Sequence, residues 1–186
     1  MATQPHPGPP PLATEYFLKT HPLSQAATHA SLYLRLHGDG ILSVVCTPTS
    51  PKFLRWTHVA EQEIATLWNH PERSFRLTLS PPRVKYGWEE VSIVSKDVEV
   101  DDKVGNKGFI WEIDEEGREI LRFGKEVYGK EEGVKAEWKG WMVCTWMLGH
   151  PQLFWVTGLS IKEEEMPSSC ERVDIVREWL IPKKGE

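Results

Sequence analysis

Three side chains of the 186-residue sequence stand where they could move a proton: His150, Glu112 and Tyr86. His150 lies in a Gly-His-Pro turn, where it is either an acid or base that titrates near neutral pH or a solvated turn residue. Glu112 faces solvent if its neighbour Trp111 faces the core. In the opposite register Glu112 points inward with Arg35, and burial could then tune its pKa. These groups are candidates for acid–base chemistry that needs no cofactor.

Tryptophan is the most distinctive component, with nine residues in the chain. Each indole can bury about 150–250 Å², so the tryptophans either fill the core or line a pocket for an apolar small molecule. A third arrangement is a surface row that stacks on sugars. The candidate pocket residues are Trp88, Trp111, Trp141, Trp146 and Trp155, with Tyr33, Tyr86 and Arg35 beside them.

Other chemistries lack their motifs. The sequence contains no nucleophile elbow, no HExxH zinc motif, no phosphate-binding glycine loop and no dinucleotide fingerprint. His37 and Asp39 could supply two metal ligands, but no third is spaced near them, so we predict no metal site and no cofactor. Cys46, Cys144 and Cys170 are odd in number and far apart, which predicts free thiols.

Charge and hydropathy limit the partners. A net charge of −5 and a pI near 5.8, without a basic run, argue against nucleic acid. No apolar stretch approaches the ~20 residues of a membrane helix. The first twelve residues lack the basic start and apolar centre of a signal peptide. We therefore expect a cytoplasmic protein, or a secreted one if a leader has been removed.

The candidate residues converge on the stretch 138–157, where two apolar runs flank the turn at 149–151. Gly and Pro between β-branched and aromatic runs predict a hairpin. Alternation along its first arm gives two sets of side chains: Trp138, Met142, Cys144 and Trp146 on one side, and Trp141, Val143 and Thr145 on the other. Because both sets are largely apolar, we expect a central hairpin that is covered on both faces.

Further alternating or apolar runs bounded by Gly and Pro predict strands. They cover residues 15–20, 31–37, 41–46, 74–80, 86–96, 108–113 and 118–123, with a hairpin loop at 114–117 and a polar loop at 128–133. Residues 59–69 carry apolar side chains at helical spacing and predict a helix. Residues 170–181 also favour a helix, because Ser168 and Glu171 are spaced as a capping box, although the apolar side chains there alternate.

The organisation predicted from these elements is a disordered Pro-rich arm over 1–13, one domain over 14–160, and an acidic linker with a C-terminal element over 161–186 that packs on the same domain. The fold class is all-β and mainly antiparallel: a closed, lipocalin-like β-barrel or a β-sandwich, with one or two short helices. A closed eight-stranded barrel encloses room for about one small ligand.

Five blocks carry a resemblance: YFLKT at 16–20, LYL at 32–34, YGWEEV at 86–91, GWMVC at 140–144 and PQLFW at 151–155. Together they resemble a family of small proteins of unknown function from filamentous fungi. Members of that family are commonly secreted and have no established catalytic residues, so the resemblance assigns no roles. This chain differs from them in having no recognisable leader and in its residues 158–186. The resemblance implies a scaffold recruited for intracellular work, such as a biosynthetic pathway.

Our hypothesis from the sequence is a small fungal β-barrel whose aromatic cavity binds an apolar secondary metabolite. Holding a flexible substrate in a reactive conformation would promote a cofactor-free cyclisation or isomerisation. The alternative is a non-catalytic lectin- or effector-like protein that uses exposed tryptophans. A third hypothesis is self-association, for example as a homodimer, through the same apolar surface.

Overall fold

The computed structural model describes residues 15–23, 28–36, 44–49, 55–59, 62–67, 74–83, 87–95, 105–129, 132–146, 150–158 and 166–180. Within these ranges the chain forms strands and turns and contains no α-helix. The predicted arm over 1–13 lies outside the described residues, as do Tyr86, His37, Asp39 and most of the acidic segment 161–169.

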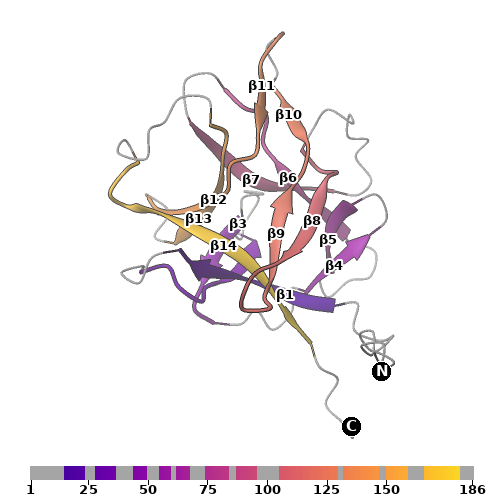
Figure 1. The fold of residues 1–186 in the computed structure, drawn as a ribbon, viewed down its shortest axis with the longest axis vertical. Helices are drawn as coiled ribbons and strands as arrows, with labels where there is room; N and C mark the ends of the chain where they lie inside the picture. Colours follow the sequence, from indigo (N-terminus) through magenta and orange to yellow (C-terminus); the bar gives the residue numbers. More distant parts are fainter. Residues whose placement is uncertain are drawn as a thin grey trace, which may run out of the picture.

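Fourteen strands are described, shown in Figure 1. They are β1 (Glu15–Pro22), β2 (Tyr33–Leu36), β3 (Val44–Thr47), β4 (Arg55–Val59), β5 (Glu63–Leu67), β6 (Ser74–Leu79), β7 (Trp88–Ser95), β8 (Phe109–Ile113), β9 (Glu119–Phe123), β10 (Glu126–Tyr128), β11 (Lys135–Glu137), β12 (Trp141–Thr145), β13 (Pro151–Val156) and β14 (Cys170–Trp179).

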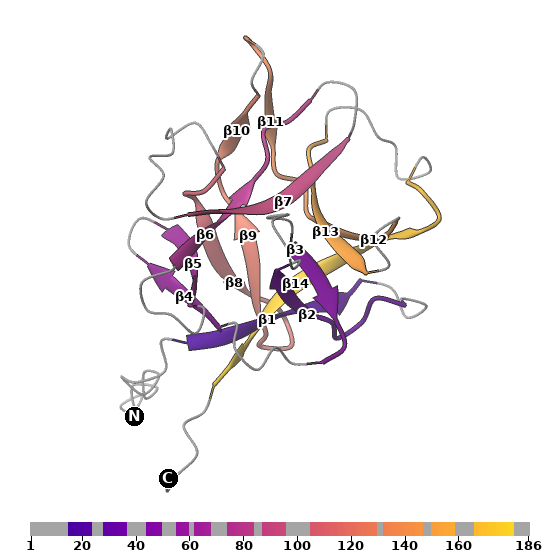
Figure 2. The ribbon, with the colours of Figure 1, turned by 180° about the vertical axis from the view of Figure 1, so that it is seen from behind.

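Twelve strands form one sheet in the order β3-β2-β1-β4-β5-β6-β7-β13-β12-β14-β9-β8, and β10 and β11 form a separate two-stranded sheet among the described strands. Every recorded strand pairing is antiparallel. Two additional pairings, β1 with β14 and β3 with β13, join distant parts of this order into rings. The first and last strands consequently lie side by side, as Figures 1 and 2 show. The prediction of an antiparallel all-β fold is confirmed, and the ring-like closure fits a barrel.

The rings meet at two forks, in β1 and β13. One edge of β1 pairs with β14 over most of its length, so its other edge must accept both β4, at Glu15 and Tyr16, and β2, at Lys19. In the same way β13 pairs with β12 along one edge and divides the other between β3, at Gln152, and β7. The paired strands β2 and β3 therefore bridge the two forks and divide the closed sheet into two rings.

Large aromatic side chains fill the interior of this sheet. Trp56, Trp141 and Trp155 are fully buried among aliphatic residues from most of the strands. The indole N–H of Trp141 donates to the carbonyl oxygen of Leu121 at 2.7 Å, and that of Trp155 donates to the carbonyl oxygen of Ser80 at 3.1 Å. Both indoles are thus buried with their polar atom satisfied, as stable core packing requires.

The two hairpins predicted from turn residues are present. Strands β12 and β13 form the central hairpin, pairing from Trp141↔Trp155 to Thr145↔Pro151. In the loop between β8 and β9, Gly117 adopts a φ of 78°, which glycine reaches without strain. The carboxylate of Asp114 accepts the backbone N–H groups of Glu116 and Arg118, so the loop is also closed by a side chain.

The two predicted helices are wrong. Residues 55–59 and 63–67 form the paired strands β4 and β5, and the connection contains Gln62 with a φ of 62°, outside the helical region. Pairing of β5 with both β4 and β6 satisfies its backbone groups and overrides the helical spacing of its apolar residues. The predicted polar loop at 128–133 begins one residue too early, because Tyr128 is part of β10 and pairs with Lys135 in the β10–β11 hairpin.

The predicted C-terminal helix is strand β14 through Trp179. Val173 and Ile175 alternate into the core, while the backbone pairs with β1, β12 and β9. The capping-box spacing predicts that Glu171 caps the start of a helix. In the structure Glu171 instead accepts hydrogen bonds from the backbone N–H groups of Thr28 and His29. The alternation of apolar residues was therefore the correct signal, and the capping-box spacing was misleading.

Replacing Trp141 by Ala should destabilise the fold strongly, because it empties a fully buried site and leaves the Leu121 carbonyl without its donor. We expect a loss of about 3–5 kcal/mol in the free energy of unfolding, measured by urea denaturation. Ile113→Ala is the control, since Ile113 is 73% exposed on β8, and it should change stability by less than about 0.5 kcal/mol. A loss below about 1 kcal/mol for Trp141→Ala would place this indole outside the packed core.

Candidate functional site

Four neighbouring strands, β7, β13, β12 and β14, carry a second apolar cluster on the face opposite the main core. Its buried members are Met142, Cys144, Phe154 and Cys170, with Trp88, Val156 and Met166 packed against them. Strand register explains the grouping, because Met142 stands between Phe154 and Arg172, and Cys144 stands beside Cys170. We call this group the outer cluster. Side chains of the first arm of the central hairpin therefore alternate between the two faces as predicted, with Trp138 as the exception.

Trp138 packs against the main core instead, with its ring centroid 5.4 Å from that of Trp141. The reason is Gly140, whose φ of 127° interrupts the strand alternation between the two tryptophans. Gly140 also leaves room for Arg172, since a Cβ added there would lie 3.0 Å from its Nη2 atom. The guanidinium donates at this point to the carbonyl oxygen of Lys139.

A pocket of about 360 Å³ opens over the outer cluster. That volume lies in the range of small-molecule sites, about 300–1,000 Å³. Its lining combines apolar side chains with two cations and two glycines: Gly87, Trp88, Lys139, Met142, Val156, Gly158, Met166 and Arg172. We call it the outer pocket. Gly158, with a φ of 71°, lets the stem of Lys139 pass close to the backbone, because a Cβ there would lie 2.9 Å from the lysine Cγ.

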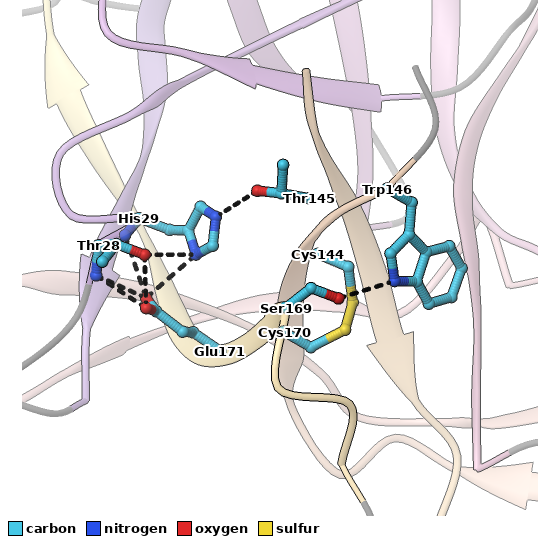
Figure 3. The surroundings of a disulfide bond; sticks show 8 residues. All are labelled: Thr28, His29, Cys144, Thr145, Trp146, Ser169, Cys170 and Glu171. Carbon is cyan, nitrogen blue, oxygen red and sulfur yellow. Dashed lines mark hydrogen bonds and ion pairs between the residues drawn. A yellow bond between two sulfur atoms is a disulfide. The ribbon is translucent and has the colours of Figure 1, made fainter. Parts of the chain in front are cut away.

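Trp146 extends the aromatic surface beside this pocket. Its ring centroid lies 4.9 Å from that of Phe154 and 6.3 Å from that of Trp88, which lines the pocket. The indole N–H donates to the hydroxyl of Ser169 at 3.1 Å, while 40% of the residue remains exposed (Figure 3). The three rings form a partly solvated aromatic ledge, in which the hydrogen bond to Ser169 holds the Trp146 indole.

A disulfide between Cys144 and Cys170 joins β12 to β14 beneath this ledge (Figure 3). The prediction of three free thiols is wrong for these two cysteines. They are 26 positions apart in sequence but directly opposite each other in the sheet, with Cα atoms 4.0 Å apart. Only strand register reveals this pairing. Cys46 is a buried free thiol, and burial raises its pKa.

The disulfide should contribute substantially to stability, because it closes a loop of 26 residues in the unfolded chain. The chain-entropy relation gives about 3.5 kcal/mol for that length. We expect the double variant Cys144→Ser, Cys170→Ser to lose about 2–4 kcal/mol in urea denaturation. Wild-type protein with reductant is the matched control and should unfold like the variant. Identical unfolding of the wild type with and without reductant would contradict this expectation.

On the other side of the same strand pair, the side chains of Glu171, His29 and Thr145 lie in a line, joined by one ion pair and one hydrogen bond. The Nε2 atom of His29 lies 2.8 Å from the hydroxyl of Thr145, and its Nδ1 atom lies 3.1 Å from Oε2 of Glu171 (Figure 3). Glu171 also accepts the backbone N–H and the hydroxyl of Thr28 and the backbone N–H of His29. Both ring nitrogens therefore have polar neighbours, and the carboxylate accepts hydrogen bonds from three donors.

These contacts determine the ionisation of Glu171. Partial burial acts to raise the pKa of its carboxyl, but the hydrogen bonds from Thr28 and His29 and the electrostatic influence of His29 outweigh burial and lower the pKa to about 2. The carboxylate is thus ionised across the physiological range and acts only as an acceptor.

Acid should weaken the fold through this carboxylate. Its folded pKa of about 2 lies below the ordinary 4.5, so its stabilising contribution is complete above pH 4.5 and is lost as the pH falls toward 2. We expect Glu171→Gln to melt several degrees below the wild type at pH 6, with the gap narrowing toward pH 2. Glu112→Gln, a change at an exposed carboxylate, is the control. A gap that stays constant with pH would show that ionisation of Glu171 does not stabilise the fold.

Residues 13–179 match a domain of unknown function, DUF7907. The chain belongs to this family. No match was found among curated proteins or among solved structures. The function of this family is unknown. The resemblance found in the sequence likewise pointed to a family of unknown function. In this DUF7907 domain, function must be inferred from the geometry of the site.

The structure separates the tryptophans that the sequence grouped together. Trp88 lines the outer pocket and Trp146 lies beside it, whereas Trp141 and Trp155 occupy the main core. Trp111 packs at the edge of that core, and its ring centroid lies 4.6 Å from the guanidinium carbon of Arg177.

The polar candidates are scattered. Glu112 is exposed and pairs with Arg122 at 3.3 Å, as expected for a register in which Trp111 faces the core, and Arg35 is exposed on β2. Tyr33 lies on the surface, where the ammonium of Lys19 sits 4.9 Å from its ring centroid. His150 is exposed immediately before β13. Tyr86 lies outside the described residues, so its part in the site stays a prediction.

The site contains residues that sequence reasoning missed. Met142 was placed on the correct face, but nothing in the sequence indicated that Arg172 would lie beside it, because Arg172 comes from a strand predicted as a helix. His29 and Glu171 are 142 positions apart and carry no motif. Among the described residues, no group of three His, Cys, Asp or Glu side chains is arranged to hold a metal ion. No helix within those residues is long and apolar enough to cross a membrane.

Proposed function

We propose that this DUF7907 protein binds a small apolar molecule with an anionic group, and that the outer pocket is the binding site. The observation that carries the proposal is a pocket of about 360 Å³ whose wall combines apolar side chains with Lys139 and Arg172. Pockets for small molecules are typically apolar with a few polar groups that fix orientation.

The apolar part of the lining suits a hydrophobic body. Trp88 offers a partly exposed indole, and Met142 and Met166 contribute flexible thioethers that adapt to irregular shapes. Apolar burial of this kind contributes about 25 cal/mol per Å² removed from water. Half of the lining lies on the adjacent paired strands β7, β12, β13 and β14, which fix its position: Trp88, Met142, Val156 and Arg172.

The charged part favours an anion. Arg172 lines the pocket while one of its nitrogens is anchored on the carbonyl oxygen of Lys139. Lys139 forms an ion pair with Glu137, at 2.6 Å, in which both side chains are more than half exposed. Exposed pairs contribute at most about 1 kcal/mol, so a ligand carboxylate can compete for the ammonium. A molecule with an apolar body and one acidic group satisfies both parts of the lining.

Cofactor-free cyclisation or isomerisation of such a ligand is the catalytic form of the proposal. An indole face beside the bound molecule can stabilise a developing positive charge, and a rigid pocket can hold a reactive conformation. The test is the mass and chromatographic mobility of a ligand after incubation. An isomer of unchanged mass would support catalysis, and unchanged ligand would leave binding as the function.

Ligand binding can be tested with 8-anilinonaphthalene-1-sulfonate, a fluorescent apolar anion. We expect saturable binding that Trp88→Ala weakens by about tenfold or more, because the variant loses an aromatic contact worth roughly 1.5–3 kcal/mol. Lys139→Met should weaken binding of decanoate more than binding of its methyl ester, read by dye displacement.

Ile113→Ala is the matched control, since it removes an exposed apolar side chain on β8 that does not line the pocket. Each variant must retain a cooperative melt. Equal dye affinity for the wild type and a folded Trp88→Ala variant would remove the outer pocket from the proposal.

Sugar binding is the second candidate, favoured by the exposure of Trp146 next to Trp88. Aromatic rings that are partly solvated and held by a hydrogen bond can stack on the apolar faces of sugars. Trp146→Ala separates the two functions: it should abolish a response to glycans while leaving dye binding within about threefold of the wild type.

The disulfide supports a location in an oxidising compartment, which differs from the cytoplasmic expectation and agrees with the secreted alternative. Alkylation of protein from its source, without reductant, tests this location. Cys144 and Cys170 should resist labelling in the unfolded chain, and labelling of both would favour a reducing compartment.

A further inference from the structure

The line of Glu171, His29 and Thr145 lies outside the lining of the outer pocket and raises a separate question. The Nδ1 atom of His29 lies 3.1 Å from Oε2 of Glu171, and the negative charge of this carboxylate favours the neutral tautomer of His29 that carries its proton on Nδ1. In that tautomer Nε2 carries a lone pair. In this tautomer the hydroxyl of Thr145, 2.8 Å away, donates a hydrogen bond to Nε2.

Of the three residues in this line, Thr145 is the most exposed to solvent. Thr145 is exposed, the side chain of His29 is 9% exposed, and that of Glu171 is 23% exposed. Thr145 is thus the solvent-facing member of the line, while the imidazole behind it is largely shielded from water. A nucleophile, a base and a group that orients the base stand in the required sequence.

The supporting structure holds all three groups in place. Thr145 and Glu171 come from the neighbouring strands β12 and β14, which pair through Val143↔Glu171 and are joined by the disulfide. The backbone N–H of Thr145 donates to the carbonyl oxygen of Ser169. Residue 28 fixes the carboxylate with its backbone N–H and its hydroxyl. Preorganisation of this kind is what general-base activation requires.

We propose that Glu171, His29 and Thr145 form an acyl-transfer site in which Thr145 is the nucleophile toward small esters. The hydroxyl oxygen of Thr145 bonds to the ester carbonyl carbon while its proton passes to Nε2 of His29. The bond from that carbon to the leaving oxygen then breaks, and His29 returns the proton to the departing alcohol. Water releases the acyl group from Thr145 as a carboxylic acid through the same base. A secondary hydroxyl is crowded, so the site fits small acyl groups such as acetyl.

The experiment uses the full chain and a fluorophosphonate probe, which forms a covalent bond with activated hydroxyl groups. We expect labelling at Thr145, located by peptide mass spectrometry. Thr145→Ser should react faster because its hydroxyl is primary, and Thr145→Ala should not react. His29→Gln should slow labelling by about a hundredfold or more, the range of a lost general base. In parallel, 4-nitrophenyl acetate should leave an acetyl group on Thr145.

Thr49→Ala is the matched control, because Thr49 is also an exposed threonine near the end of a strand, and it should leave labelling unchanged. A purely structural role for the network predicts a different outcome: His29→Gln would lower the melting temperature, yet the folded Thr145→Ser variant would remain unlabelled. Absence of label from both the wild type and folded Thr145→Ser would overturn the proposal, as would equal labelling with and without His29. None of these outcomes depends on the outer pocket, so the two proposals fail independently.

Discussion

Pairing between the first and last described strands is the constraint on which the rest of the structure depends. Strand β1 pairs with β14 from Tyr16↔Trp179 to Pro22↔Val173, joining residues more than 150 positions apart. This closure removes the edges that β1 and β14 would otherwise expose. It also forces the other edge of β1 to fork between β2 and β4, which divides the sheet into two rings. Both candidate sites lie against β14, so each depends on this pairing.

Side chains along β12 alternate between the main core and the opposite face of the sheet. Trp141 and Val143 point into the main core, while Met142 and Cys144 point to the opposite face. Because β7, β13 and β14 lie alongside, that opposite face carries the outer cluster, with Arg172 beside Met142. The same alternation that fills the interior with indoles produces an apolar surface on the outside. A single strand pair, closed by a disulfide, therefore supports both the core and the outer pocket.

Much of the fold could be predicted from the sequence, and much less of the sites. Turn residues and alternation located the central hairpin and the loop at 114–117, because these signals are local. The helices predicted at 59–69 and 170–181 were wrong, since sheet pairing from distant strands overrode local spacing. The Cys144–Cys170 bond and the contact of His29 with Glu171 depend on register between residues far apart in sequence. Nothing in one sequence encodes such register visibly, so the interior cavity expected from the tryptophan count could not be distinguished from a pocket on the outer face.

The most direct test of this account is an NMR titration of nitrogen-15-labelled protein, following the nine tryptophan indole N–H signals as decanoate is added. Trp88 lines the outer pocket and Trp146 contacts Trp88 beside it, whereas the indoles of Trp141 and Trp155 donate to backbone carbonyls inside the core. The account predicts saturable shifts of the Trp88 and Trp146 signals with little change at Trp141 and Trp155. Shifts confined to Trp141 and Trp155 would contradict it, because they would place the ligand inside the closed sheet.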